Sequence, residues 1–581
     1  MTSASSNRRN ALRACALVAW IVVAPSACML DLQGKATGGT GGTGGTGGTT
    51  STTTAPSSST SSVGGGTSAS TGTGGAAPTT CDPGVTSVCY EGPAGTVDVG
   101  ECKRGMHTCD LDGMAYDACS TQVLPKPEDC FKSEDEDCDG KADPCTGTTL
   151  KGASLGTSPN DEVIFAVATD PSGNLLVGGV NGATPPSGEL FAMSSGVGRV
   201  AKILEDGKQS WSAQMSSVAP NAYSVVRGLA TDKDGNVFVV GEFQGTTTNG
   251  AINVVAVGGI DIFLAKLDPT GKTLWAKPFG NGADQYGYSV AVDKVGNVFI
   301  TGRSDGNVDF GGGDPGVGAG AGDNLFVVKF DTAGTHLWSK AFGDDSIQVG
   351  YAVATTPKGD VVVSGELSGT MDFGADISLV SAGDKDIFVA KLAGLDGAPI
   401  WARHYGDDQA QSANGVAVSS DGSVVLTGSM VGHFKIGSAD LDAKSKANVV
   451  VAKLNADGDV VWAHEYGSDN ENQVGLNIAV DPAQNILVVG YLKGTLKFGG
   501  ITLTDVSSGG KTDIFVAKLT SGGDTIWAYR FGDAMDETAW AVTADSASNV
   551  FVGGTYEGTL DLPPSITAQG SYDGFWFELA P

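Results

Sequence analysis

Asp135, Asp137 and Asp139 stand at alternate positions in the segment EDEDCDGKAD, directly before a glycine. Alternate carboxylates ahead of a sharply turning glycine let one loop wrap oxygen ligands around Ca²⁺. An EF-hand-like loop that starts at Asp135 has a bidentate Glu at its twelfth position, where this chain has Thr146, whereas Asp143 stands at the ninth position. A solvated acidic loop is the favoured interpretation of this segment. The alternative is a calcium site of structural role with Asp135, Asp137, Asp139 and Asp143 as ligands.

Cysteines are concentrated in the same part of the chain. They are Cys81, Cys89, Cys102, Cys109, Cys119, Cys130, Cys138 and Cys145. A dense, even set behind an export signal predicts a small module held together by disulfides, because the segment has too few large apolar residues for a core. The pairing stays open, since eight cysteines allow 105 connectivities. Zinc is the weaker alternative, because the segment has no CxxC pair and His107 is its only histidine.

Other motifs that resemble catalytic sites belong to a repeat. GRSDG (302–306) matches the nucleophile pattern G-x-S-x-G, but the same place reads GEFQG (241–245) and GELSG (365–369) elsewhere. The glycines at 311–316 spell a dinucleotide fingerprint without a following helix to bind phosphate. The histidines of the repeat region show no spacing that predicts a shared site. We therefore predict no catalytic residues and no enzyme activity.

The N-terminus has the organisation of an export signal. A basic stretch with Arg8, Arg9 and Arg13 precedes an apolar run, and small residues then lead to Cys28. This arrangement resembles a bacterial lipoprotein signal, which implies removal of residues 1–27 and lipid attachment at Cys28. Simple secretion is the alternative, because Pro25 stands where that motif usually has Leu. The segment from Gly34 to Thr80 is almost entirely Gly, Thr, Ser and Ala, so we predict that residues 28–80 form a disordered linker behind the lipid-attachment residue.

A phrase recurs along the rest of the chain, as in DIFLAKLDPTGKTLWAKPFG (261–280) and DIFVAKLTSGGDTIWAYRFG (513–532). Its period is roughly 63 residues, which indicates an array of supersecondary units. Each unit has four short runs rich in Val, Ile, Phe and Trp, separated by Gly-, Asp- and Asn-containing turns. We therefore predict an all-β fold: a seven-bladed β-propeller of four-stranded blades over residues 147–581. TTLKGASLG (148–156) aligns with TLWAKPFG, so we expect this N-terminal strand to complete the last blade and close the ring.

These repeats resemble the bacterial SBBP-type β-propeller family, whose hallmark is AVDxxGNVFVTG followed by DIFVAKLDxxGxxLWAKxFG. The resemblance covers nearly everything after Thr148 and implies a seven-bladed propeller at the cell envelope or surface without a general activity. The preceding cysteine-rich module (81–146) and linker are similar to those of predicted lipoproteins with such propellers.

The net charge of −30 argues against nucleic acid as a partner. We expect an exported monomer, anchored to the outer membrane or cell surface by lipid only, whose propeller is a binding scaffold for a protein or polysaccharide. A periplasmic or secreted location is the alternative. A structural role in the envelope or matrix, and an enzyme with a central-channel site, are the competing functions. On a repetitive frame the variable loops are the expected binding surface, above all 307–323 and 499–512.

Overall fold

The computed structural model describes residues 81–90, 97–98, 102–112, 115–124, 148–155, 161–183, 196–217, 222–249, 252–313, 322–468, 471–506, 510–562 and 564–581. The chain forms two compact units, one within residues 1–141 and the other comprising 129–133 and 142–581. The predicted signal peptide and linker, the lipid-attachment residue Cys28 and the calcium ligands Asp135, Asp137, Asp139 and Asp143 lie outside the described residues. Cys130, Cys138 and Cys145 also lie outside them.

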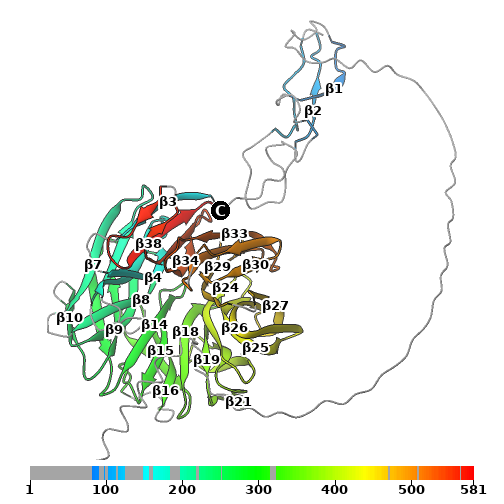
Figure 1. The fold of residues 1–581 in the computed structure, drawn as a ribbon. Helices are drawn as coiled ribbons and strands as arrows, with labels where there is room; N and C mark the ends of the chain where they lie inside the picture. Colours follow the sequence, from blue (N-terminus) through cyan, green and yellow to red (C-terminus); the bar gives the residue numbers. More distant parts are fainter. Residues whose placement is uncertain are drawn as a thin grey trace, which may run out of the picture. The chain divides into compact units, whose positions relative to one another are not determined.

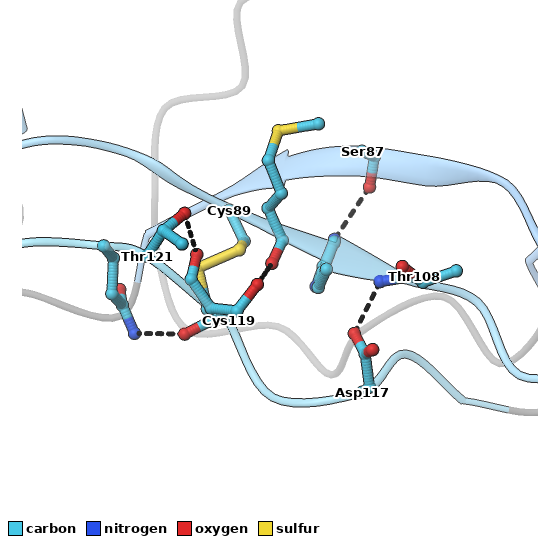
Figure 2. Close-up of a disulfide and its surroundings, with 10 residues drawn as sticks. Ser87, Cys89, Thr108, Asp117, Cys119 and Thr121 are labelled. Atoms are coloured by element: carbon cyan, nitrogen blue, oxygen red, sulfur yellow. Dashed lines mark hydrogen bonds between the residues drawn. A yellow bond between two sulfur atoms is a disulfide. The ribbon is translucent and has the colours of Figure 1, made fainter.

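The first unit contains a disulfide-linked hairpin of β1 (Thr86–Cys89) and β2 (Gly105–Thr108), which pair antiparallel. Cys81 is bonded to Cys109 and Cys89 to Cys119, and Cys102 is also disulfide-bonded. Figure 2 shows how the Cys89–Cys119 bridge joins the hairpin to the segment that follows it. The prediction of a disulfide-linked module is therefore confirmed for these five cysteines.

The second unit is a seven-bladed β-propeller, as the repeats predict (Figure 1). Each blade has four antiparallel strands, and the first strand of each blade is its innermost one. At blade 1 a hairpin of residues 246–255 adds two strands beside the outermost strand, which makes that sheet six-stranded. The strands of blades 1 to 4, from the innermost outward, are β4 (Asp161–Thr169), β5 (Leu175–Ala183), β6 (Val197–Ile203), β7 (Gln209–Ser217); β8 (Tyr223–Thr231), β9 (Val237–Gln244), β12 (Asp261–Leu267), β13 (Thr273–Phe279); β14 (Gln285–Val292), β15 (Val298–Asp305), β16 (Asp323–Phe330), β17 (His336–Phe342); β18 (Gln348–Thr355), β19 (Val361–Leu367), β22 (Asp386–Leu392), β23 (Pro399–Tyr405).

The remaining blades and the small hairpins in the loops complete the unit. Blades 5 to 7 consist of β24 (Gln411–Val418), β25 (Val424–Ile436), β26 (Ala439–Leu454), β27 (Val460–Tyr466); β28 (Gln473–Val480), β29 (Ile486–Leu492), β32 (Asp513–Leu519), β33 (Thr525–Phe531); β34 (Glu537–Ala544), β35 (Val550–Tyr556), β38 (Asp573–Leu579), β3 (Thr149–Ser154). Hairpins between the second and third strands are β10 (Thr246–Asn249) with β11 (Ile252–Val255), β20 (Thr370–Gly374) with β21 (Ile377–Val380), β30 (Thr495–Phe498) with β31 (Ile501–Thr504), and β36 (Thr559–Leu560) with β37 (Ile566–Thr567).

The core lies between neighbouring blades, where the apolar runs of the repeat face each other. One cluster joins Phe299 and Val327 of blade 3 to Val363 and Phe388 of blade 4, all of which are fully buried. The third strand is buried along its whole length in blades 2, 4, 6 and 7, because both of its faces pack against other blades. This burial explains why the DIFVAKL run is nearly continuous rather than alternating.

The ring is closed by the predicted N-terminal strand. β3 pairs antiparallel with β38, so the sheet order of blade 7 is β3-β38-β35-β34. Residues from the two ends of the propeller segment thus share one sheet, and Ala580 donates its backbone N–H to the carbonyl of Thr148 at 2.9 Å. The structured strand is Thr149–Ser154, slightly shorter than the predicted 148–156.

In several blades the recurring Lys and Trp of the repeat phrase join one blade to the next. In blade 3, Lys329 Nζ and Trp338 Nε1 both donate to the carbonyl of Gly394, in the outer turn of blade 4, at 2.5 and 3.2 Å. In blade 4, Lys391 and Trp401 share the carbonyl of Ala456 at 3.4 and 3.1 Å. Because the Lys and the Trp donate to the same carbonyl of the next blade, both residues make contacts between blades in addition to being buried.

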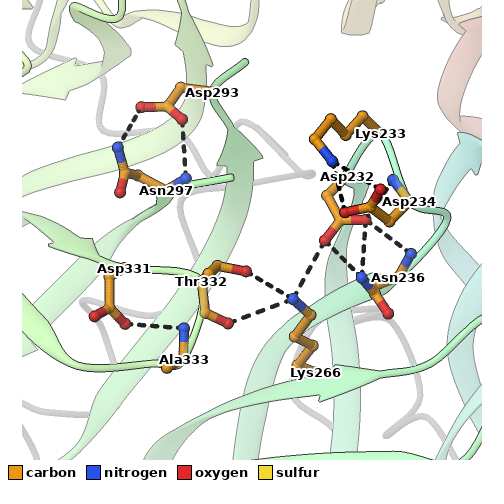
Figure 3. A network of polar contacts seen from close by, with 10 residues as sticks. All are labelled: Asp232, Lys233, Asp234, Asn236, Lys266, Asp293, Asn297, Asp331, Thr332 and Ala333. Carbon is orange, nitrogen blue, oxygen red and sulfur yellow. Dashed lines mark hydrogen bonds and ion pairs between the residues drawn. The ribbon is translucent and has the colours of Figure 1, made fainter. Parts of the chain in front are cut away.

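The same lysine also reaches back to its own blade. Lys266 donates to Thr332 Oγ1 of the next blade at 2.8 Å and forms an ion pair of 3.2 Å with Asp232 (Figure 3). Asp232 begins the turn between the first two strands and accepts from the backbone and side-chain amides of Asn236. The DxxGN turn therefore has a second role beyond reversing the chain, since its Asp holds the lysine that joins the blades.

Within the described part of the chain, no helix combines the length and apolar character that crossing a membrane requires.

Candidate binding site in the central channel

The innermost strand of every blade contains a β-bulge at the same place. In β8, for example, Val226 pairs with Gly241 and Gly228 pairs with Val240, which leaves Arg227 as an extra residue. Bulges of this kind commonly re-aim a side chain next to a functional site. The seven extra residues are Phe165, Arg227, Tyr288, Tyr351, Asn414, Leu476 and Trp540.

These bulged residues meet one another from blade to blade. Phe165 of blade 1 lies between its two neighbours, because its ring centroid is 5.8 Å from that of Trp540 and the Arg227 guanidinium carbon lies 4.3 Å above it. Tyr288 and Tyr351 of blades 3 and 4 have ring centroids 5.8 Å apart. The innermost strands surround the axis of the propeller (Figure 1), so the seven bulged residues, one in each blade, are arranged in a ring about that axis. We call these seven residues the channel ring.

Charged residues from the second strands support the ring. Arg227 makes two hydrogen bonds to Glu242 of β9, at 2.6 and 3.2 Å, and both side chains are buried. Arg303 of β15 pairs with Asp323 and lies 4.4 Å above the ring of Tyr286. A planar guanidinium held by a carboxylate keeps a fixed orientation.

Two further members of the channel ring are held by hydrogen bonds between uncharged groups. Asn414 donates to the carbonyl of Gly475 in the next blade at 2.9 Å, and Trp540 Nε1 donates to Thr555 Oγ1 at 3.0 Å.

Burial raises the pKa of Tyr288 above its usual range, an effect that the nearby Arg303 charge partly opposes. Burial also raises the pKa of Tyr351, and the carboxylate of Glu366 adds to this rise. Both phenols are therefore neutral at physiological pH and can donate as well as accept hydrogen bonds.

None of the seven members of the channel ring is a Ser, Cys or His. Two carboxylates beside it are paired with cations: Glu242 with Arg227, and Glu366 with Lys385 at 2.9 Å. Aromatic faces beside an oriented guanidinium can stack on the flat or apolar surface of a ligand and hydrogen-bond its polar edge.

Sequence reasoning did not predict the channel ring. Its residue types differ between most blades, so the position has no recurring letter, and the expected binding residues were placed in the variable loops. The available signal was the register: each ring member follows the start of its inner strand at a similar spacing, as Tyr288 follows Gln285 and Tyr351 follows Gln348. Arg227 and Glu242 are paired beside the ring, and the charges of both residues and of Arg303 act on Tyr288.

The structure describes part of each loop that we predicted to bind a partner. Of the two favoured loops, the structure describes 307–313, 322–323, 499–506 and 510–512. The repeat-region histidines His336, His404, His433 and His464 lie in separate strands and do not form a shared site.

Comparisons with known proteins agree with a propeller repeat. A family model described as "Beta-propeller repeat" (SBBP) matches residues 275–308, which run from the outer strand of blade 2 into blade 3. An uncharacterized WD repeat-containing protein, L264, of Acanthamoeba polyphaga mimivirus is 23% identical over 623 residues, covering 83% of this chain and 43% of the relative. The regulatory protein FlaEY of Caulobacter vibrioides is 26% identical over 162 residues, covering 27% of this chain and 17% of the relative. The chain thus spans less than half the length of the curated relatives that it matches.

Two solved structures with similarity are a WD40 β-propeller domain and an alcohol dehydrogenase. The WD40 β-propeller domain of Doa1 has a TM-score of 0.39 at 10% identity, covering 74% of this chain and 96% of that one. Quinohemoprotein alcohol dehydrogenase from Comamonas testosteroni has a TM-score of 0.37 at 10% identity, covering 74% and 76%.

Proposed function

We propose that this β-propeller repeat protein is an exported, lipid-anchored monomer of the outer membrane or cell surface that binds an extracellular polysaccharide through the channel ring. The propeller then serves as a binding scaffold without catalytic activity. The observation that carries the proposal is the set of seven bulged residues, one per blade, that places aromatic rings and a guanidinium around one axis. A bulge repeated in register at the channel indicates a surface organised around one ligand position.

Polysaccharide is favoured over a protein partner by the shape and chemistry of the ring. A sugar ring has an apolar face of C–H groups that stacks on aromatic side chains and a polar edge of hydroxyls. Tyr288, Tyr351 and Phe165 supply aromatic faces, while Arg227 and Asn414 supply polar groups. A protein partner would instead need a broad contact area, on the order of 800 Å² per partner.

Binding to purified envelope and matrix polysaccharides tests the proposal. The exported chain carrying Cys28→Ser would be immobilised and challenged with a polysaccharide panel, and the double variant Tyr288→Ala/Tyr351→Ala compared with Leu395→Ala. Leu395 is 89% exposed on an outer turn, so its truncation leaves the channel unchanged. We expect saturable binding that the double Tyr variant weakens about 10-fold or more and the control preserves. Equal binding by both variants would exclude the channel ring, and capture of a protein alone would favour a protein-binding scaffold.

Anchoring and calcium binding are separate parts of the proposal. Lipid attachment at Cys28 predicts that Cys28→Ser moves the protein from the membrane fraction to the soluble fraction, whereas simple secretion predicts no change. Calcium at Asp135, Asp137, Asp139 and Asp143 would stabilise the disulfide-linked module. It predicts that Asp137→Asn/Asp139→Asn removes a calcium-dependent protection of that module from proteolysis. A solvated acidic loop predicts the same proteolysis with and without calcium.

A further inference from the structure

One side chain of the channel ring has an open hydrogen-bond acceptor. Asn414 is 8% exposed, and its Nδ2 donates to the carbonyl of Gly475 at 2.9 Å. Its Oδ1 is buried and has no hydrogen-bond partner among the described residues. A buried acceptor without a donor is costly, and the hydroxyl group of a ligand would supply that donor. The amide oxygen is uncharged, so it accepts a hydroxyl without requiring a charged ligand.

Three cations beside the ring are each held by a carboxylate. They are Arg227 with Glu242, Arg303 with Asp323, and Lys385 with Glu366. Two of these carboxylates are almost fully buried, since the side chains of Glu242 and Glu366 are 2% and 4% exposed. An acidic group of a ligand would have to replace a buried carboxylate as the partner of its cation, which would leave that carboxylate unpaired. These pairs therefore mask the positive charges beside the ring.

The inner strands themselves contain few charges. All seven are described, and Arg227 is the only Lys or Arg residue among them. Their acidic residues are Asp161, Glu162 and Glu537, at the first or second position of a strand. Burial raises the pKa of Glu537 to about 9, so this residue is neutral at physiological pH. The wall of the channel thus has one cation, and that cation is already paired.

The segments that lead into the inner strands carry negative charge. Three of them contain acidic residues and no Lys or Arg: GDDSI (343–347), GDDQA (406–410) and GDAMD (532–536). The first aspartate of each, Asp344, Asp407 or Asp533, accepts two backbone N–H groups at 2.7 to 2.9 Å. Backbone N–H groups favour the ionised carboxylate and do not neutralise it. Together with the net charge of −30, these carboxylates disfavour the approach of an acidic polysaccharide to this end of the channel.

From these contacts we propose that the channel ring selects an uncharged polysaccharide, one of whose hydroxyl groups donates to Asn414 Oδ1. The inference rests on the proposed function, because it names the class of polysaccharide that the same site binds. Carboxylate or sulfate groups would lose their hydration without meeting a free cation. Amino groups would meet Glu242 and Glu366 only in competition with Arg227 and Lys385. Glu242 and Glu366 are therefore specificity-determining residues, since they mask the charges that would otherwise attract an acidic ligand.

Fractionated polysaccharide tests the charge of the ligand. Envelope and matrix polysaccharides would be separated by ion exchange into uncharged, acidic and amino-containing pools and offered to the immobilised exported chain carrying Cys28→Ser. We expect saturable binding of the uncharged pool, weakened by Tyr288→Ala/Tyr351→Ala. Its affinity should change less than about 2-fold as NaCl rises from about 50 to about 500 mM, because no ion pair forms with the ligand.

The other outcomes separate this inference from the proposed function. Binding of the acidic or the amino-containing pool alone, with an affinity that falls as salt rises, would overturn the inference and leave the channel ring as a polysaccharide site. Binding of no pool, or binding of the uncharged pool that the double Tyr variant leaves intact, would overturn the proposed function and the inference together.

Unmasking one cation tests the role of its carboxylate. Glu366→Gln keeps the shape of the side chain and leaves Lys385 without its carboxylate partner, so this variant should bind the acidic pool about 10-fold or more tighter than the parent at low salt. Glu366→Gln/Lys385→Gln has no unmasked cation and should lack this gain. Asp206→Asn, which unmasks the exposed Lys208 in an outer turn of blade 1, is the matched control and should lack it too. Equal affinity of Glu366→Gln and the parent for the acidic pool would overturn the masking by Glu366.

The acceptor of Asn414 is tested with the uncharged pool. Asn414→Ala removes the open amide oxygen and should weaken binding of this pool about 10-fold. The thermal unfolding midpoint of the variant, measured in parallel, identifies any loss that comes from unfolding. A folded variant that binds the uncharged pool as tightly as the parent would overturn the assignment of Asn414 as a ligand contact.

Discussion

Lys151 and Glu578 form an ion pair of 2.8 Å in the sheet that closes the propeller. They are directly opposite each other in the register of β3 and β38, at the place where Lys266 faces Trp275 in blade 2. The last blade thus replaces the repeated Lys–Trp pair with an oppositely charged pair contributed by the two ends of the propeller segment. Because these ends are not joined by a turn, a charge pair between them adds specificity to the closure.

Removal of one partner of this pair should destabilise the propeller. Glu578 is almost fully buried, with 5% of its side chain exposed, so Lys151→Met leaves a carboxylate without its cation. We expect a loss of about 2 kcal/mol in the free energy of unfolding, measured by urea denaturation. The double variant Lys151→Met/Glu578→Gln should recover most of this loss. Equal losses in the single and double variants would show that the pair contributes no coupling energy.

The contact between Trp338 and the outer turn of blade 4 should be sensitive to a single methyl group. Gly397 has a φ of +71°, and a Cβ there would lie 2.9 Å from Trp338 Cε3. Gly359 has a φ of +87° but nothing within 4 Å of its Cβ position. The variant Gly359→Ala therefore measures the cost of backbone strain without a steric clash. Gly359→Ala should cost about 1 kcal/mol, and Gly397→Ala about 1 to 3 kcal/mol more, because the indole must move. Equal unfolding midpoints for the two variants would contradict the proposed role of the Trp.

The buried pair in the channel ring should behave differently from a surface salt bridge. The side chains of Arg227 and Glu242 are 7% and 2% exposed. Arg227→Met therefore leaves a buried, uncompensated carboxylate and should lower the free energy of unfolding by about 3 to 5 kcal/mol. The double variant Arg227→Met/Glu242→Gln should be much closer to the parent. Chemical denaturation measures the free energy of unfolding of the single and the double variant. A small loss in Arg227→Met alone would indicate that water reaches Glu242.

The architecture was largely predictable from the sequence, and the binding site was not. The phrase around Trp275 recurs because burial and contacts between blades constrain the same residues in every repeat, and such constraints are visible as periodicity. Closure by residues 148–156 was predictable for the same reason, although Lys151 replaces the expected Trp. The proposed binding site lies at the position where the repeats differ, as between Arg227 and Tyr288. A position whose residue type varies between repeats leaves no periodic signal in the sequence. Only the register of the β-bulge shows that the seven residues at this position lie around one axis.

The raised pKa of Glu162 should make the stability of the propeller depend on pH. Glu162 is 4% exposed, and neither of its carboxyl oxygens has a hydrogen-bond partner among the described residues. Burial, reinforced by the charge of Asp573, raises its pKa from 4.5 to about 7, although Arg199 opposes this rise. Between these two values the folded chain retains a proton that the unfolded chain has released. The stabilising contribution of the neutral carboxyl is therefore complete below about pH 4.5 and is lost as the pH rises through 7.

The corresponding measurement is the difference in unfolding free energy between Glu162→Gln and the parent, at several pH values from 4.5 to 8. A glutamine side chain does not ionise, so the variant lacks the pH dependence that Glu162 causes. All other groups contribute equally to both proteins and cancel in the difference. We expect the variant to gain on the order of 2 kcal/mol relative to the parent as the pH rises from 4.5 to 7, with little further change by pH 8. Asp206→Asn, which alters an exposed carboxylate, should track the parent. A constant difference between Glu162→Gln and the parent would mean that Glu162 is ionised throughout, with Arg199 outweighing the effect of its burial.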